Sequence, residues 1–211
     1  MPKIKETHSS IYSEIGAGDI IISSPYTEMG VIFNKTVIYI ISHSQDGTTG
    51  VIINKLLKKV DSETILKALD IDASSINLKD FNLNEKNISI YFGGPIEQNK
   101  GIMLQSESNN IILSTKINDY ISVSNSLNIV NDLTLHAESK YNMIILGYSS
   151  WGANHLLSEI KDNNWVVLSK LSDRQVLYNL IFANEHYLKW NMALKLAGIK
   201  PGFYNNCLGR A

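Results

Sequence analysis

The residues best suited to chemistry follow an apolar run that ends at Gly147, where the chain reads Gly-Tyr-Ser-Ser-Trp-Gly. A serine hydrolase places its nucleophile in a G-x-S-x-G turn between a strand and a helix. The pattern fails here by one residue in either register, because Trp151 replaces the second glycine for Ser149 and Tyr148 replaces the first for Ser150. We therefore predict a tight strand-to-helix turn with Trp151 packed inward, and no nucleophile.

Metal and phosphate chemistry have no matching pattern. The histidines are scattered, with no H-x-x-x-H pair, and they are His8, His43, His136, His155 and His186. Asp46-Gly47 resembles a fragment of a calcium loop, but the other acidic positions are missing and a hairpin turn explains the pair. Neither G-x-G-x-x-G nor a P-loop occurs. We predict no metal and no cofactor.

A second informative segment, residues 91–101, runs from a predicted strand into Gly93, Gly94 and Pro95, with Glu97 close behind. Glycine permits close backbone approach and proline fixes φ, so this segment shapes the backbone. Irregular backbone at strand ends is where clefts form. We predict a ligand-binding depression with Glu97 at its rim, formed by Asn54, Gly93, Gly94, Pro95, Glu97, Tyr148 and Trp151. The alternative is that the two glycine motifs lie at opposite ends of the sheet and only stop strands.

Composition limits the classes of partner. The formal net charge is −1 and the arginines are Arg174 and Arg210, whereas a nucleic-acid module is usually basic and rich in arginine. Direct nucleic-acid binding is therefore not expected. The N-terminal residues lack the apolar core of a secretory signal, and no run is long enough to span a membrane. Cys207 is the single cysteine, which excludes an internal disulfide. We expect a cytoplasmic protein without a membrane segment.

A β-hairpin is predicted early in the chain. Residues 36–43 and 50–54 are two β-branched runs, and Asp46-Gly47 between them is a strong hairpin turn signal. Both runs are apolar at successive positions, which indicates strands covered on both faces. The sheet that contains them is expected to lie in the interior.

The remaining elements are strands in the middle of the chain and helices toward its end. Further strands are predicted at 20–22, 88–92, 101–106, 111–114, 120–124, 141–147 and 165–168, with the four from 88 to 124 as a meander. Helices are predicted at 62–69, 126–135, 153–161, 174–182 and 185–197, and a surface loop at 70–87. In the last helix, Trp190 forms a core stripe with Tyr187, Leu194 and Ala197. Gly198 follows in the position that favours the left-handed conformation.

With 44% apolar residues the chain can bury a sizeable core, and no linker or repeat interrupts the pattern. Regular β-α alternation is absent from the middle, so a doubly wound fold is not expected. We predict an α+β fold in one domain over residues 18–211, preceded by an N-terminal extension of residues 1–17.

Four segments together resemble the YqgE/AlgH family of bacterial proteins. They are residues 36–43, Gly50 to Lys55, Tyr91 to Glu97, and Gly147 to Ala153, and the ending from Lys189 to Ile199 agrees as well. The resemblance implies a single α+β domain with a coiled, bifurcated, largely antiparallel sheet and flanking helices. It also implies a cytoplasmic protein without an established activity, although members carry the label of transcriptional regulators.

The function expected from these observations is a non-enzymatic regulatory or binding protein whose partner is an unidentified protein or small molecule. The alternative is a small hydrolase or transferase that uses Glu97 as a base. Such an enzyme requires Glu97 to lie in a cleft with a perturbed pKa and a nearby partner.

Overall fold

A computed structural model of the chain describes residues 15–60, 88–106, 114–125, 141–182 and 185–199. The described strands are β1 (Ile20–Ser23), β2 (Val37–His43), β3 (Gly47–Ile52), β4 (Leu56–Val60), β5 (Ile88–Phe92), β6 (Ile96–Ser106), β7 (Thr115–Lys116), β8 (Ile121–Asn125), β9 (Asn142–Gly152) and β10 (Trp165–Leu168). The described helices are α1 (Gly30–Phe33), α4 (His155–Lys161), α5 (Arg174–Phe182) and α6 (Lys189–Leu196), and a 3₁₀ turn, η4, covers His186–Leu188. None of these helices is long and apolar enough to cross a membrane.

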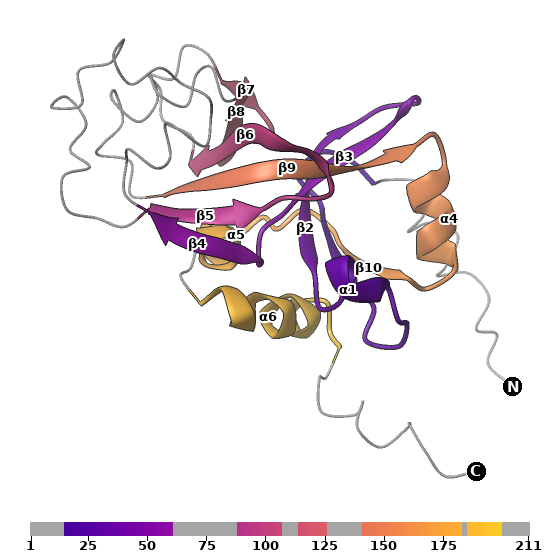
Figure 1. The fold of residues 1–211 in the computed structure, drawn as a ribbon. Coiled ribbons are helices and arrows are strands. Elements are labelled where there is room, and N and C mark those ends of the chain that lie inside the picture. The colour runs from indigo at the N-terminus through magenta and orange to yellow at the C-terminus, as the bar shows by residue number, and fades with distance from the viewer. Residues whose placement is uncertain (1–14, 61–87, 107–113, 126–140, 183–184, 200–211) are drawn as a thin grey trace, which may run out of the picture.

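The strands form one curled sheet in the order β10-β1-β2-β3-β9-β6-β8-β7 (Figure 1). All neighbours along this path are antiparallel. The predicted hairpin is confirmed, since β2 pairs with β3 in a register that places Ile38 opposite Ile52. Its turn is closed by hydrogen bonds between the backbones of Ser44 and Gly47.

The sheet forks at β9, which has different neighbours along its two halves. The first half lies between β6 and β5, and β5 is parallel to it. The second half pairs with β3. Because β5 and β3 occupy the same edge of β9 one after the other, the sheet divides there into two branches, and β4 extends the β5 branch. The α+β class predicted from the sequence pattern is thus confirmed, and so is the bifurcated, largely antiparallel sheet implied by the family resemblance.

Close backbone contact between the two glycine motifs makes the fork possible. Gly93 and Gly94 cross β9, and a Cβ on either would overlap the backbone carbonyl of Gly147 or Tyr148. Gly147 itself has φ +74°, and a Cβ there would lie 2.7 Å from the carbonyl oxygen of Gly94. Ile52 N donates to the carbonyl of Gly93 at 2.9 Å, which joins the two branches. The glycines therefore act through backbone geometry.

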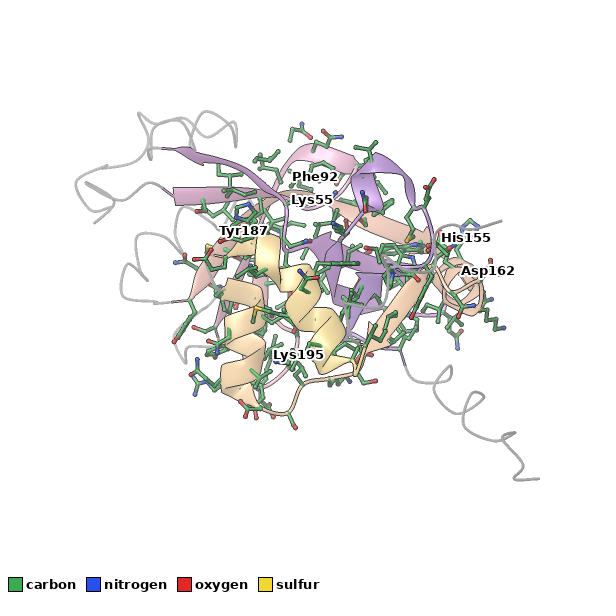
Figure 2. All side chains as sticks on the ribbon, turned by 90° about the horizontal axis from the view of Figure 1, so that it is seen from below. Lys55, Phe92, His155, Asp162, Tyr187 and Lys195 are labelled. Carbon is green, nitrogen blue, oxygen red and sulfur yellow. The ribbon has the colours of Figure 1, made fainter. Side chains whose placement is uncertain are left out.

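Each face of the sheet has its own core. Strand residues alternate between the faces, so that Ile20, Tyr39 and Val51 lie in the larger core, while Ile21 and Ile38 lie in the smaller one. Buried residues of α5 and α6 complete the larger core, and those of α4 complete the smaller one. Seen from below, α5 and α6 cover the larger core side by side (Figure 2).

Several predicted elements match the structure and several do not. The strands at 88–92 and 165–168 and the helix at 174–182 are confirmed. The meander is wrong, because β9 inserts between β5 and β6. The predicted turn at 147–152 is also wrong: the left-handed φ of Gly147 lets β9 bend and continue to Gly152, and Asn154 makes the turn instead.

The last helix is shorter than predicted, because a 3₁₀ turn precedes α6. Tyr187 lies in that turn and is 66% exposed, so it does not belong to the core stripe, whereas Trp190 and Leu194 are buried. Gly198 adopts the predicted left-handed conformation with φ +78°. Ile15 packs in the smaller core, three residues before the domain start predicted at residue 18. The elements predicted at 62–69, 70–87, 111–113 and 126–135, and Cys207, lie outside the described residues.

Candidate functional site

A groove of about 400 Å³ lies between the segment that joins β1 to β2 and the start of α6. Its lining combines one indole ring, two opposite charges and several hydrogen-bonding groups. The lining residues are Ser24, Pro25, Thr27, Glu28, Gly30, Val31, Asn34, Lys35 and Trp190. Its volume falls within the range of small-molecule sites, which begins at about 300 Å³.

Trp190 is held rigidly in the wall of this groove. Its Nε1 donates to the carbonyl oxygen of Ser23 at 3.0 Å and lies 3.1 Å from the Ser23 hydroxyl. The same hydroxyl accepts from the backbone N–H of Thr36 at 2.7 Å. Because the indole N–H is already bonded inside the protein, Trp190 can offer a ligand only the apolar surface of its ring.

Lys35 stands over the indole in a strained backbone conformation. Its ammonium nitrogen lies 5.7 Å from the centroid of the Trp190 ring, which is cation–π range. Lys35 has φ +49°, the left-handed region that a non-glycine residue rarely adopts. Strained residues of this kind cluster at binding sites, where the surrounding structure holds them in place.

The chain segment that follows β3 supplies this restraint. Asn54 donates from Nδ2 to the carbonyl of Lys35 at 2.8 Å and accepts from the backbone N–H of Val37 at 2.8 Å. Lys55 donates from Nζ to the carbonyl of Val31 at 3.1 Å, and partial burial lowers its pKa. Asn54 and Lys55 thus fasten the groove wall at both ends of α1; Figure 2 labels Lys55.

Thr27 contributes a hydroxyl whose hydrogen bonds are unmet. Its Oγ1 is buried and has no hydrogen-bond partner among the described residues. A buried hydroxyl without a partner costs roughly 1–3 kcal/mol. Because this oxygen has almost no exposed surface, a ligand in the groove does not reach it in this structure.

The comparisons with known proteins agree with the fold. The AlgH-like family matches residues 20–202. The chain belongs to this family. A UPF0301 protein of Rickettsia typhi is 30% identical over 195 residues, which cover 92% of this chain and 95% of that protein. A UPF0301 protein of Rickettsia canadensis is 28% identical over the same shares.

Two solved structures resemble this AlgH-like chain in fold. The solution structure of the AlgH protein from Pseudomonas aeruginosa has a TM-score of 0.65 at 22% identity, over 99% of this chain and 100% of that chain. The X-ray structure of a Corynebacterium diphtheriae protein has a TM-score of 0.56 at 19% identity, over 75% and 78% of the two chains.

Five of the residues predicted to bind a ligand gather where β6 meets the middle of β9. Gly93 and Gly94 contact the backbone of β9, and Pro95 follows them. The side chain of Glu97 hydrogen-bonds both Lys100 and Tyr148. None of the five lines the groove beside Trp190, and none lines a second hollow between the tip of the β2–β3 hairpin and the start of α4. Their role in ligand binding stays a prediction.

The other two predicted residues lie elsewhere. The side chain of Asn54 is buried beside Lys35, where it fastens the groove. Trp151 is buried in the smaller core, as predicted, with its ring 5.9 Å from that of Trp165. Both indole N–H groups donate to one carboxylate oxygen of Glu159, at 2.9 and 2.6 Å, which fastens α4 to β9 and β10.

The geometry of Glu97 does not suit a general base. Its side chain is 48% exposed and pairs with Lys100 at 2.9 Å. The hydrogen bond from Lys100 lowers the pKa of Glu97, whereas a carboxylate base that works near neutrality needs a raised one. Within the described part of the chain, His, Cys, Asp and Glu form no cluster of three that could hold a metal.

A second hollow of about 400 Å³ lies between the tip of the β2–β3 hairpin and the start of α4. Its lining includes Gln45, Asn154 and Leu156, together with His43, whose Nδ1 lies 2.7 Å from the hydroxyl of Thr48. It combines fewer features of a ligand site than the groove beside Trp190, because its described lining residues include no indole or phenyl ring and no pair of opposite charges.

Sequence reasoning assigned none of the lining residues of the groove to a ligand site, and the missed residues include Thr27, Glu28 and Lys35. They lie in a polar loop, and nothing in their spacing shows that the loop folds against α6. It also missed Lys189, which is fully buried and donates from Nζ to the carbonyls of Ile53 and Ile181. The position of this lysine next to Trp190, on the apolar face of a predicted helix, could have indicated that Lys189 is buried.

Proposed function

We propose that this protein is a non-enzymatic, cytoplasmic binding protein with a regulatory role, and that its ligand site is the Trp190 groove. The observation that carries the proposal is the strained Lys35, whose backbone carbonyl is bonded by the side chain of Asn54 and whose ammonium lies 5.7 Å from the centroid of the Trp190 ring. Lys35 is one of four described non-glycine residues with a positive φ, and the only one of them that lines the groove. Strained residues are common at binding sites, which supports a binding role for Lys35.

Regulation through a ligand or protein partner fits the charge of the chain better than direct DNA contact does. The formal net charge is −1, and the whole sequence holds two arginines. A protein that neutralises many phosphates needs a basic surface. We therefore propose that the transcriptional label of the family reflects an indirect effect. The single cysteine is typical of a reducing compartment, which supports a cytoplasmic location.

An NMR screen tests the site. Pools of metabolites, covering organic acids, amino acids, sugars and nucleotides, are added to ¹⁵N-labelled protein. At least one pool is expected to shift the indole N–H resonance of Trp190 and the amide resonance of Lys35, while the indole resonances of Trp151 and Trp165 stay in place. The three tryptophans therefore serve as one reporter and two internal references.

Two matched variants decide where the binding occurs. Asn34 and Gln45 are exposed residues that line the Trp190 groove and the second hollow, respectively. Asn34→Trp fills the first and is expected to abolish the shifts, while Gln45→Trp fills the second and is expected to leave them unchanged. The proposal is overturned if no pool shifts Trp190, or if the shifts survive Asn34→Trp.

A further inference from the structure

The groove carries one positive and one negative side chain that are not paired with each other. Glu28 and Lys35 both line it and both are exposed. Among the described residues, the ion pairs join other side chains, and neither Glu28 nor Lys35 takes part in one. Two opposite charges left apart in one groove can each pair with a complementary charge on the same ligand.

These charges argue against ligands with a single kind of charge. A simple anion would be attracted by Lys35 and repelled by Glu28, and a simple cation would meet the reverse. A nucleotide with several phosphates would need more cations than Lys35, the one lysine among the described residues that line the groove. A small zwitterion, with its two charges close together, uses both side chains.

The rest of the lining suits an apolar group beside those charges. Trp190 is 9% exposed and its N–H is bonded to Ser23, so it offers a small area of ring surface to the groove. Pro25 and Val31 add aliphatic surface to the same groove.

From this arrangement we infer that the groove binds a free α-amino acid with an apolar side chain. Its carboxylate pairs with Lys35, its ammonium pairs with Glu28, and its side chain packs against the ring of Trp190. The inference rests on the proposed binding function and names the ligand class of that same groove.

Three related probes distinguish the contribution of the ammonium group of the ligand from that of its carboxylate. They are L-phenylalanine, 3-phenylpropanoate, which lacks the ammonium group, and 2-phenylethylamine, which lacks the carboxylate. Binding is measured by the shift of the Trp190 indole resonance on titration. L-phenylalanine is expected to bind at least about tenfold more tightly than either analogue, because each lost contact is a hydrogen bond to a charged group. Glycine is expected to bind more weakly than L-phenylalanine, because it lacks the side chain.

Two variants of exposed residues test whether Lys35 pairs with the carboxylate of the ligand and Glu28 with its ammonium group. Lys35→Gln is expected to weaken L-phenylalanine about tenfold and to leave 2-phenylethylamine unaffected or tighter. Glu28→Gln is expected to weaken L-phenylalanine similarly and to leave 3-phenylpropanoate unaffected or tighter. The inference is overturned if the analogues bind as well as L-phenylalanine, or if either variant leaves its affinity unchanged.

The failure of this inference can be told apart from the failure of the proposed function. If no amino acid shifts Trp190 but another metabolite does so and is blocked by Asn34→Trp, the groove is a binding site for a different ligand class. The amino-acid inference then falls, and the binding function stands. If no metabolite of any class shifts Trp190, both fall.

Discussion

Replacing Lys189 with methionine is expected to change how the stability of the protein depends on pH. The Lys189 ammonium is fully buried, and among the described residues no carboxylate pairs with it. Its Nζ donates to two backbone carbonyls, those of Ile53 on the strand side and Ile181 in the last turn of α5. A neutral amine has two N–H groups, so the uncharged form already satisfies both carbonyls.

The magnitude follows from the shifted titration of this amine. Burial lowers the pKa of Lys189 from 10.5 to about 7. Between these values the unfolded chain binds a proton that the folded protein does not, so the stability of the wild type rises with pH. At about 1.4 kcal/mol per pKa unit, the gain from pH 7 to pH 9 is roughly 2 kcal/mol. The penalty for burying the charge is present in full below pH 7 and disappears as the pH approaches 10.5.

Among the described residues, Tyr91 is a titratable group that faces this amine, with its ring centroid 5.2 Å from Nζ. Burial raises the pKa of Tyr91, so the phenol stays neutral across this range and does not reverse the sign. Lys189→Met removes the titration and leaves both carbonyls without a donor, at a cost of roughly 1–3 kcal/mol for each.

Urea denaturation at pH 7, 8 and 9 measures the effect. The free energy of unfolding of the wild type minus that of Lys189→Met is expected to rise by about 2 kcal/mol over this range, whichever protein is the more stable at pH 7. Lys195→Met, at an exposed position of the same helix, is the control and is expected to show a constant difference from the wild type. If the free energy of unfolding of the wild type minus that of Lys189→Met stays constant or falls as the pH rises, the reasoning is refuted.

Three further predictions concern the fork, the groove and nucleic acids. Gly94→Ala is expected to lose about 3 kcal/mol of stability in urea denaturation, because the new Cβ overlaps β9, while Gly152→Ala, with nothing within 4 Å, changes stability by less than about 0.5 kcal/mol. Equal effects of the two would contradict the close contact. Asn54→Ala is expected to cost about 2 kcal/mol, from two hydrogen bonds, and to shift the amide resonance of Lys35; an unmoved Lys35 resonance would count against its anchoring role. Duplex DNA is expected to bind with a Kd weaker than about 1 μM at physiological salt, and sequence-selective nanomolar binding that survives added salt would overturn this.

The sequence by itself determined the local elements, because these depend on neighbouring residues. The Asp46-Gly47 turn between two β-branched runs specifies the hairpin, and helical spacing specifies α5. The family is also set by sequence, since its motifs keep their order along the chain. Gly93 and Gly94 predict an irregular backbone, but the sequence does not show that this segment crosses β9.

Only the tertiary structure decided how the strands are ordered and which residues share a site. Local pattern predicted a strand end at Gly147, but contact with Gly94 lets β9 bend and continue, and no local signal encodes that contact. The groove likewise joins Lys35 to Trp190, residues far apart in sequence, through bonds made by Asn54 and Ser23. Such contacts depend on long-range packing of the folded chain, which spacing along the sequence does not reveal.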